Sequence, residues 1–360
     1  MKIVIFGLSV SSSWGNGHAA LWRGLIRALL DAGHRVTFYE RDVPYYAANR
    51  DLLALPPGGE LVLYPDWASA LPRIARDLDG ADVGMVTSYC PDGLAATELV
   101  LDSGLPVRCF YDLDTPVTLA RLAAGERVDY IGPDGLAGFD LVLSYTGGGA
   151  LEALRTRLGA RRTAPIYGSV DPELHRPAAP RPEYRALLSY LGTYAADRQA
   201  ALERLFVEPA RRLPRERFVI GGAQYPDEFP WTVNTHFVRH LPPPEHPAFY
   251  SSSRLTLNVT RDAMARMGWC PSGRLFEAAS CQVPILSDWF DGLDEFFAPG
   301  REILVAHTTD DAMAALSLSD AELTAIARRA RERTLEEHSA TRRAAEMTAA
   351  FEAATTRETV

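Results

Sequence analysis

Short apolar runs alternate with amphipathic segments along the first half of the chain. Residues 3–6 (IVIF) predict a buried strand, and residues 19–32 carry apolar side chains at helical spacing soon after it. The further strands that this pattern predicts in the first half are 35–40, 61–64, 83–86, 107–111 and 140–144. Strands that alternate with helices form a parallel sheet covered on both faces, and such sheets bind ligands at the carboxyl ends of their strands.

A proline-rich segment interrupts the alternation at residues 166–184, and we interpret it as a linker. The alternation then restarts, with predicted strands at 187–192, 217–222, 236–241, 254–259, 283–287 and 302–306. We therefore expect one Rossmann-like domain over 1–165 and a second over 185–340. A final helix over 341–360 is then free to cross back to the first domain.

The composition is that of a globular protein with two cores. The 360 residues are 47% hydrophobic, and the net charge of −9 argues against nucleic acid as a partner, because nucleic-acid-binding proteins normally carry a basic face. No apolar stretch is long enough for a transmembrane segment. The four scattered cysteines indicate free thiols in a reducing compartment, so we expect a cytoplasmic protein.

Lysine is almost absent from the chain. Lys2 is the single lysine, and it stands at the start of the first predicted strand, whereas the other basic residues are all arginines. P-loop NTPases, protein kinases and pyridoxal-phosphate enzymes each need a lysine deep in the active site. The sequence therefore excludes these three classes of enzyme.

The most informative segment covers residues 270–305. Glu277 is predicted one turn into a helix at the edge of the second sheet, where a carboxylate can accept hydrogen bonds from ribose hydroxyls. Arg274 precedes it by one turn, and Ser272 and Gly273 open the helix with free backbone N–H groups. Together these groups can hold a diphosphate. The alternatives are an acid that only the helix dipole favours, and an arginine in a surface or interdomain salt bridge.

The segment SGRLFEAASCQVP resembles the donor-binding motif of retaining GT-B glycosyltransferases, E-A-x-A-x-G-x-P-V, which a G-G-x-x-E element follows. It is more narrowly similar to the CgeB (spore maturation protein) family, with its S-x-R-L-F-E-A-A and D-x-x-x-G-L-E-x-F-F motifs. GSVDPELHRP, LGTYAADR and HPAFYSSSRLTLNVTR agree with that family, so the similarity covers about residues 166–310. It implies the GT-B fold, in which two Rossmann-like doubly wound domains face a cleft. It also implies that Glu277 binds the nucleotide ribose and that Arg274 faces the pyrophosphate.

The chain departs from the retaining pattern at one position. Many retaining members carry an earlier acid, in an E-x7-E spacing, where this chain has Trp269. Tryptophan can stack on a base or a sugar, but it accepts no hydroxyl proton. Glu295 and Asp291 then become the candidates for a sugar-facing acid. The motif favours retention of the anomeric configuration, and the missing acid leaves the stereochemistry open.

The loop after the first strand, Ser9–His18, ends in GNGH. Gly15 and Gly17 allow the backbone to approach a ligand closely, although they are too few for the G-x-G-x-x-G pattern of NAD-binding proteins. His18 is a candidate for a contact to the transferred sugar, or for a general base if the enzyme inverts. The alternative is a histidine that only begins the next helix.

Two other positions carry candidate chemistry. FYDLDTP ends a strand with Asp112 and Asp114, and Asp114 is a candidate for an acceptor or sugar contact, with a metal site or simple strand-end capping as alternatives. Arg261 follows a predicted strand and is a second phosphate candidate. His236 and His240 are four residues apart, but on a strand and without an accompanying acid, so we expect no zinc there and no bound metal elsewhere.

We therefore predict a glycosyltransferase that moves a hexosyl group from a nucleoside-diphosphate sugar, with UDP, GDP or dTDP as the nucleotide, and retention favoured by the motif. No cofactor is expected besides this donor substrate. The acceptor is a small molecule, a glycan or a protein, and it is expected to bind to the N-terminal domain. Two alternatives remain open: a nucleotide-sugar 2-epimerase of the same architecture, and a sugar-nucleotide-binding protein without catalytic activity.

Overall fold

The computed structural model describes residues 1–355 and divides into two compact units, each built on its own sheet. The first unit contains Met1–Tyr167 together with the chain from Ala340 on, and the second contains Gly168–Ser339. The proline-rich segment after Gly168 thus belongs to the second unit. Among the described residues, no helix is both long and apolar enough to cross a membrane.

The first unit has a seven-stranded parallel sheet in the order β3-β2-β1-β4-β5-β6-β7. Its strands are β1 (Lys2–Gly7), β2 (Arg35–Arg41), β3 (Gly59–Tyr64), β4 (Val83–Thr87), β5 (Val107–Asp112), β6 (Leu141–Ser144) and β7 (Thr163–Pro165). All six strands predicted for this half are present, and the three-residue β7 is too short to have left a pattern. The strand order reverses between β1 and β4, which is the position where doubly wound sheets bind ligands.

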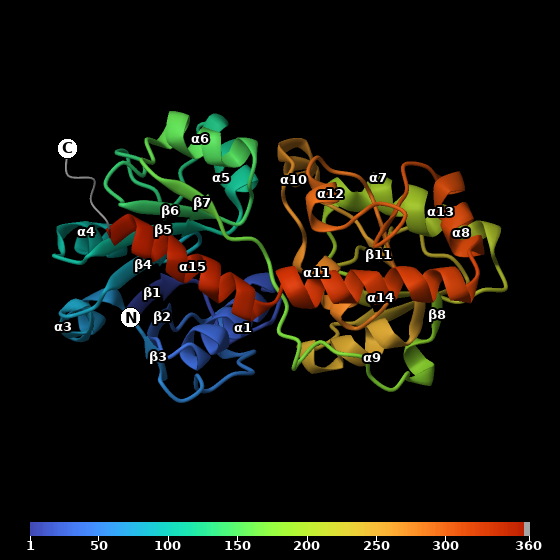
Figure 1. Cartoon of the computed structure of the whole chain (residues 1–360), viewed down its shortest axis with the longest axis horizontal. Helices are drawn as coiled ribbons and strands as arrows, with labels where there is room; N and C mark the ends of the chain where they lie inside the picture. Colours follow the sequence, from blue (N-terminus) through green and yellow to red (C-terminus); the bar gives the residue numbers. More distant parts are fainter. Residues whose placement is uncertain (356–360) are drawn as a thin grey trace. The chain divides into compact units, whose positions relative to one another are not determined.

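Helices cover both faces of this sheet. Alternate residues of β1 point to opposite cores, with Ile3 and Ile5 on one side and Val4 and Phe6 on the other. The first core is closed by α1 (Gly17–Asp31) and α15 (Ala340–Thr355), which lie side by side (Figure 1). The second is closed by α3 (Trp67–Leu78), α4 (Gly93–Asp102) and α6 (Gly149–Leu158). The short helix α2 (Pro44–Ala47) follows β2, and α5 (Thr115–Ala123) follows β5.

The C-terminal helix α15 therefore belongs to the first unit, although the chain reaches it only after the whole second unit. Ala344, Met347 and Phe351 are buried in the same core as Leu25 and Leu29 of α1. Of the segment 341–360 expected to form this helix, residues 356–360 lie outside the described part of the chain.

The second unit has a six-stranded parallel sheet in the order β10-β9-β8-β11-β12-β13. Its strands are β8 (Ala186–Leu191), β9 (Phe218–Gly222), β10 (Thr235–Arg239), β11 (Ser253–Asn258), β12 (Ile285–Ser287) and β13 (Leu304–Val305), all of which the sequence predicts. The order reverses between β8 and β11, so a ligand of this unit is expected at the carboxyl ends of these two strands.

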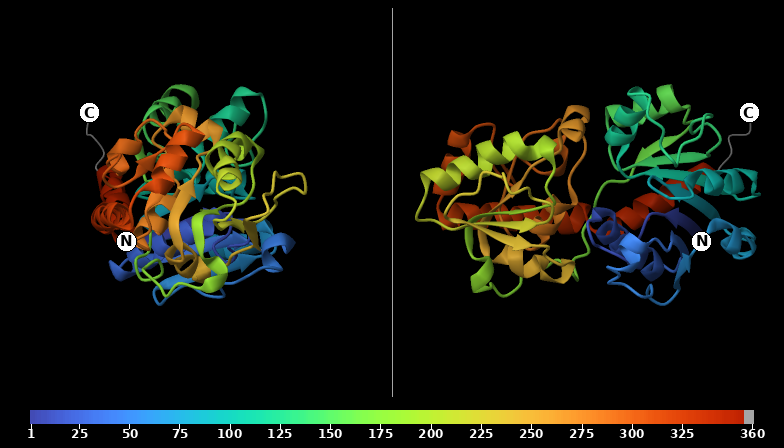
Figure 2. Two further views of the ribbon diagram at one scale, coloured as in Figure 1. Left: turned by 90° about the vertical axis from the view of Figure 1, so that its right-hand side faces the viewer. Right: turned by 180° about the vertical axis from the view of Figure 1, so that it is seen from behind.

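One face of this sheet carries α7 (Gln199–Leu202), α8 (Glu208–Arg212) and α13 (Thr309–Ser317), and a π-helical turn joins α7 to α8 (Figure 2). The other face carries α9 (His246–Ser251), α11 (Gly273–Ser280) and α14 (Asp320–Glu337). The short helices α10 (Asp262–Met267) and α12 (Leu293–Phe296) follow β11 and β12, and the pattern predicts neither of them.

Candidate functional site

Arg274 lies at the position in the second unit where the strand order reverses. Its Nη1 donates to the backbone oxygen of Leu191 at 2.9 Å, at the end of β8, and its Nη2 donates to that of Val259 at 3.2 Å, just after β11. Nε donates to the Oγ of Ser272 at 3.1 Å, and Nη1 also reaches the hydroxyl of Tyr190 at 3.1 Å. The loops after β8 and β11 therefore hold the guanidinium group in a defined orientation.

Arg198, which the sequence analysis did not single out, brings a second guanidinium group to the same place. Its Nη1 lies 3.2 Å from the hydroxyl of Tyr190 and 3.2 Å from the backbone oxygen of Thr193. Within residues 1–355 neither Arg198 nor Arg274 forms a salt bridge with a carboxylate. Burial alone would raise the pKa of Tyr190, but the two guanidinium groups outweigh burial and lower the pKa. Two guanidinium groups that no carboxylate pairs with in a salt bridge can together hold an anion.

A sequence signal for Arg198 does exist. It stands at the end of LGTYAADR, the loop that follows the first strand of the second sheet. In doubly wound domains this loop borders the bound phosphates. A basic residue in it is therefore a phosphate candidate, on the same grounds that made Arg261 one.

Glu277 lies one helical turn after Arg274 and faces inward. Its Oε2 lies 3.4 Å from the hydroxyl of Tyr250, 3.5 Å from Nδ1 of His246 and 3.9 Å from Nε2 of His175. Burial would raise the pKa of Glu277, but His175, His246 and Arg274 lower it to about 2. Because all three contacts use Oε2, Oε1 stays available to accept hydrogen bonds from a ligand.

The other residues predicted to bind the sugar nucleotide offer backbone N–H groups or, in one case, a side chain that is already paired. Ser272 and Gly273 begin α11, where the first backbone N–H groups of a helix lack intrahelical partners. Arg261 precedes α10, and its Nε lies 3.3 Å from Oδ2 of Asp197, the neighbour of Arg198 in the chain. The structure thus brings Arg274, Arg198 and Ser272 together and leaves Arg261 paired with an acid.

Glu295 and Asp291, the candidates for a sugar-facing acid, are both exposed. In the described chain the side chain of Glu295 makes no contact with Glu277 or Arg274, so its role stays a prediction. Trp269, which replaces the earlier acid, packs against Gly292, where an added Cβ would meet the indole ring at 2.7 Å. Gly292 has a φ of +87°, so glycine suits this position in both backbone conformation and space.

In the first unit a buried carboxylate shapes the loop after β1. Glu40, at the end of β2, is fully buried and accepts hydrogen bonds from the Ser9 hydroxyl (2.8 Å), the Val10 N–H (2.8 Å) and the Ser11 N–H (2.9 Å) and hydroxyl (2.5 Å). Asn16 closes the loop, because its side chain accepts from the backbone N–H of His18 at 3.1 Å. His18 is therefore placed by a loop that Glu40 organises.

Replacing Glu40 with glutamine should destabilise the chain, because the uncharged amide N–H₂ cannot accept the hydrogen bonds that a carboxylate oxygen accepts in this buried site. Loss of charged hydrogen bonds without solvent access costs about 3 kcal/mol, which corresponds to a decrease of about 6–12 °C in the melting temperature of a unit of this size. The matched control is Glu60→Gln, whose carboxylate is 55% exposed in its salt bridge with Arg73. Thermal unfolding of both variants checks this, and equal melting temperatures would contradict the structural role of Glu40.

His18 lies in the first turn of α1 and faces Asp114, which follows β5. Its Nε2 is 3.6 Å from Oδ2 of Asp114, and the hydroxyl of Tyr89, in the loop after β4, donates to the same oxygen at 3.1 Å. The Nδ1 of His18 is buried without a hydrogen-bond partner, so Nε2 is its accessible nitrogen. The two predicted residues thus meet at the carboxyl end of β4, which lies between β1 and β5, beside the strand-order reversal of the first sheet.

The remaining residues of the first unit that the sequence singles out are Asp112, Gly15 and Gly17. Asp112 is fully buried, and its Oδ1 accepts from the Asp114 N–H and the Thr118 hydroxyl, both at 3.1 Å. Burial raises the pKa of Asp112 to about 6. Gly15 has a φ of +60°, which favours glycine, whereas Gly17 begins α1 with open space around it. A Cβ added at Gly17 would meet no other atom of the described chain within 4 Å.

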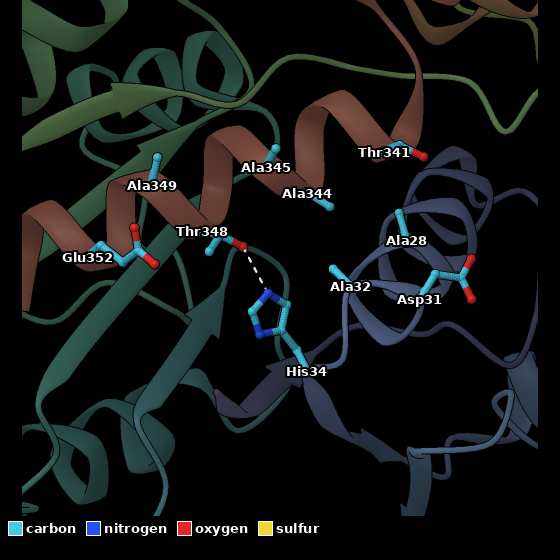
Figure 3. Close-up of a pocket in the computed structure, with 10 residues that line it drawn as sticks. All are labelled: Ala28, Asp31, Ala32, His34, Thr341, Ala344, Ala345, Thr348, Ala349 and Glu352. Atoms are coloured by element: carbon cyan, nitrogen blue, oxygen red, sulfur yellow. Dashed lines mark hydrogen bonds between the residues drawn. The ribbon is translucent and has the colours of Figure 1, made fainter.

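A shallow groove on the first unit lies between α1 and α15 (Figure 3). Half of its ten lining residues are alanine, and in it Nε2 of His34 lies 3.2 Å from the hydroxyl of Thr348. None of the predicted site residues lines this groove. We assign it to the packing of the two helices.

Comparison with known proteins gives one family match and several solved structures of the same fold. Residues 198–349, less than half of the chain, match the family described as "Glycosyl transferase-like". No curated protein sequence matches the chain. The catalytic domain of starch synthase IV from Arabidopsis thaliana, bound to ADP and acarbose, is similar in structure, with a TM-score of 0.69, 11% identity and 99% of both chains covered.

Two further solved structures have the same architecture. Sucrose-phosphate synthase from Thermosynechococcus elongatus has a TM-score of 0.68 and 14% identity, with 98% of both chains covered. Anabaena HepE, in complex with UDP and glucose, has a TM-score of 0.65 and 11% identity, with 98% of this chain and 100% of that chain covered. At these identities the structures show the fold alone, and they confirm the predicted GT-B fold. The family match confirms the predicted enzyme class: the chain is a glycosyltransferase.

Proposed function

We propose that the chain transfers a hexosyl group from a nucleoside-diphosphate sugar to a hydroxyl group of an acceptor, with the donor bound by the second unit and the acceptor by the first. One observation carries the proposal. The guanidinium groups of Arg198 and Arg274 converge on Tyr190 without a carboxylate partner, beside the N-terminus of α11 and one turn from the carboxylate of Glu277. The similarity to the CgeB family over about residues 166–310 is part of the same proposal.

The chemistry on the donor side follows from these groups. Oε1 of Glu277 accepts hydrogen bonds from the ribose hydroxyls, while Arg198, Arg274 and the first N–H groups of α11 surround the diphosphate. As the bond between the anomeric carbon and the diphosphate oxygen breaks, the electron pair leaves with the diphosphate. The two cations stabilise the negative charge that develops there. No step requires a metal ion.

The chemistry on the acceptor side uses His18. Its Nε2 takes the proton of the acceptor hydroxyl while the oxygen forms a bond to the anomeric carbon, and the imidazolium that results is stabilised by Asp114, 3.6 Å away. A base that activates direct attack leads to inversion of the anomeric configuration. We therefore propose inversion, although the donor motif by itself favours retention.

A thermal-shift screen with UDP, GDP, dTDP, ADP and CMP tests the donor site. One nucleoside diphosphate should raise the melting temperature, because a ligand that binds only the folded chain stabilises it by mass action. Arg198→Ala should weaken its binding about 10- to 100-fold, as expected for the loss of a charged hydrogen bond. The matched control is Arg215→Ala, an exposed arginine in a loop of the same unit.

Equal binding by the two arginine variants would contradict the diphosphate site. Incubation of the matching sugar nucleotide without an acceptor, followed by product analysis, tests the reaction itself. A transferase leaves the sugar configuration at C2 unchanged, whereas an epimerase alters it.

A further inference from the structure

Two histidines enclose the inner oxygen of Glu277, and the proposed function uses neither of them. His175 comes from the proline-rich segment and His246 begins α9, so the three residues belong to three separate parts of the second unit. Their ligand atoms all lie within 4.8 Å of one another. His175 is 6% exposed, and neither of its ring nitrogens has a hydrogen-bond partner. A buried imidazole without a partner costs free energy unless something else satisfies it.

The contacts of His246 indicate which of its two ring nitrogens carries the hydrogen. Its Nε2 lies 3.3 Å from the backbone oxygen of Leu241. A carbonyl oxygen can only accept, so Nε2 carries the hydrogen, and the Nδ1 of the neutral ring then has a lone pair. That lone pair lies 3.5 Å from the carboxylate Oε2 of Glu277, and Nδ1 forms no hydrogen bond. Two electron pairs that face each other need a cation between them, either a proton on Nδ1 or a metal ion.

We propose that His175, His246 and Glu277 bind a divalent transition-metal ion, with Zn²⁺ the best fit. Two imidazoles and one carboxylate are a known zinc ligand set, with a fourth position left for water. Bonds of about 2.0–2.1 Å place tetrahedral ligands roughly 3.3 Å apart. The separations of 3.5 and 3.9 Å from Oε2 therefore need only small shifts. The bond from Nε2 of His246 to a backbone carbonyl is the usual second contact of a metal-bound histidine.

The proposed metal and the ribose use different oxygens of one carboxylate. Oε2 faces the histidines and the Tyr250 hydroxyl, whereas Oε1 remains for the nucleotide. The metal is then structural, because it fixes the orientation of Glu277 and ties the proline-rich segment to α11. The hydrogen bond from the Ser280 hydroxyl to the backbone oxygen of His175 already joins these two elements.

Metal content tests the proposal directly. The purified full chain, stripped with a chelator and dialysed against Zn²⁺, should retain one Zn²⁺ per chain. With Co²⁺ as the probe it should show the intense visible absorption of a tetrahedral ion. His246→Gln and His175→Asn should each weaken Co²⁺ binding about 100-fold or more, since even the loss of a residue behind a ligand costs 10- to 100-fold. His236→Asn, an exposed histidine of the same unit, is the matched control and should bind Co²⁺ as the wild type does.

The outcomes separate this proposal from the proposed function. Arg198→Ala should lose nucleotide binding and keep the Co²⁺ spectrum, and nucleotide binding by the wild type is measured with excess chelator. Wild-type binding of Co²⁺ no tighter than that of a folded His246→Gln variant would overturn the metal site, as would a weak octahedral spectrum. The Glu277 carboxylate would then form an ion pair with a protonated histidine instead of binding a metal ion. If His175→Asn does not fold, the Zn²⁺ content of the wild type and the His246→Gln variant decide.

Discussion

Replacing Glu277 with glutamine is expected to weaken binding of the matching nucleoside diphosphate by about 100-fold. A hydrogen bond to a charged group contributes about 1.5–3 kcal/mol, and the amide that replaces the carboxylate carries no charge for the ribose hydroxyls. Glutamine has nearly the same shape as glutamate, so the packing of α11 should be preserved. Isothermal titration with the nucleotide identified in the thermal-shift screen measures the effect.

The control for this change is Glu295→Gln, an exposed carboxylate in the same motif. Its nucleoside diphosphate affinity should stay within about twofold of the wild type, as is usual for a surface substitution away from such contacts. Melting temperatures of both variants show whether each is folded. If folded Glu277→Gln binds as tightly as Glu295→Gln, Glu277 does not bind the ribose.

Replacing His18 with asparagine is expected to lower kcat by about 10²- to 10⁴-fold, the usual contribution of a general base. The affinity for the nucleoside diphosphate should not change, because His18 belongs to the first unit and the donor groups to the second. A loss in kcat with unchanged donor binding is the result that a purely structural role would not produce. Steady-state kinetics with the sugar nucleotide measures kcat, and titration measures binding.

His34→Asn provides the matched control in the first unit. His34 lies in the groove between α1 and α15, away from Asp114, and its replacement should leave kcat within about twofold. The anomeric configuration of the first-formed product, observed by NMR, tests inversion independently. A retained configuration would contradict His18 as the base of a direct displacement. So would a kcat for His18→Asn as high as that for His34→Asn.

The sequence by itself determined the fold class, and it named most residues of the candidate site. Buried strands and amphipathic helices leave local periodicities, and these placed every strand except β7, together with the helix that carries Arg274 and Glu277. The short elements β7, α2, α10 and α12 were not predicted, because three to six residues are too few to show a period. The near absence of lysine also excluded whole enzyme classes, since the single lysine, Lys2, stands at the start of the first strand and cannot reach an active site.

Only the tertiary structure decided which of these residues act together. Arg198 with Arg274, His175 with His246 and Glu277, and His18 with Asp114 are each far apart in the chain. His18 and Asp114 meet because only β4 lies between β1 and β5 in the first sheet, and Arg198 meets Arg274 because β8 adjoins β11 in the second. Periodicity reports whether a segment is a strand or a helix, but it carries no information on strand order. The neighbours of Glu277, and with them the proposed metal site, follow from that order and from the path of the proline-rich segment.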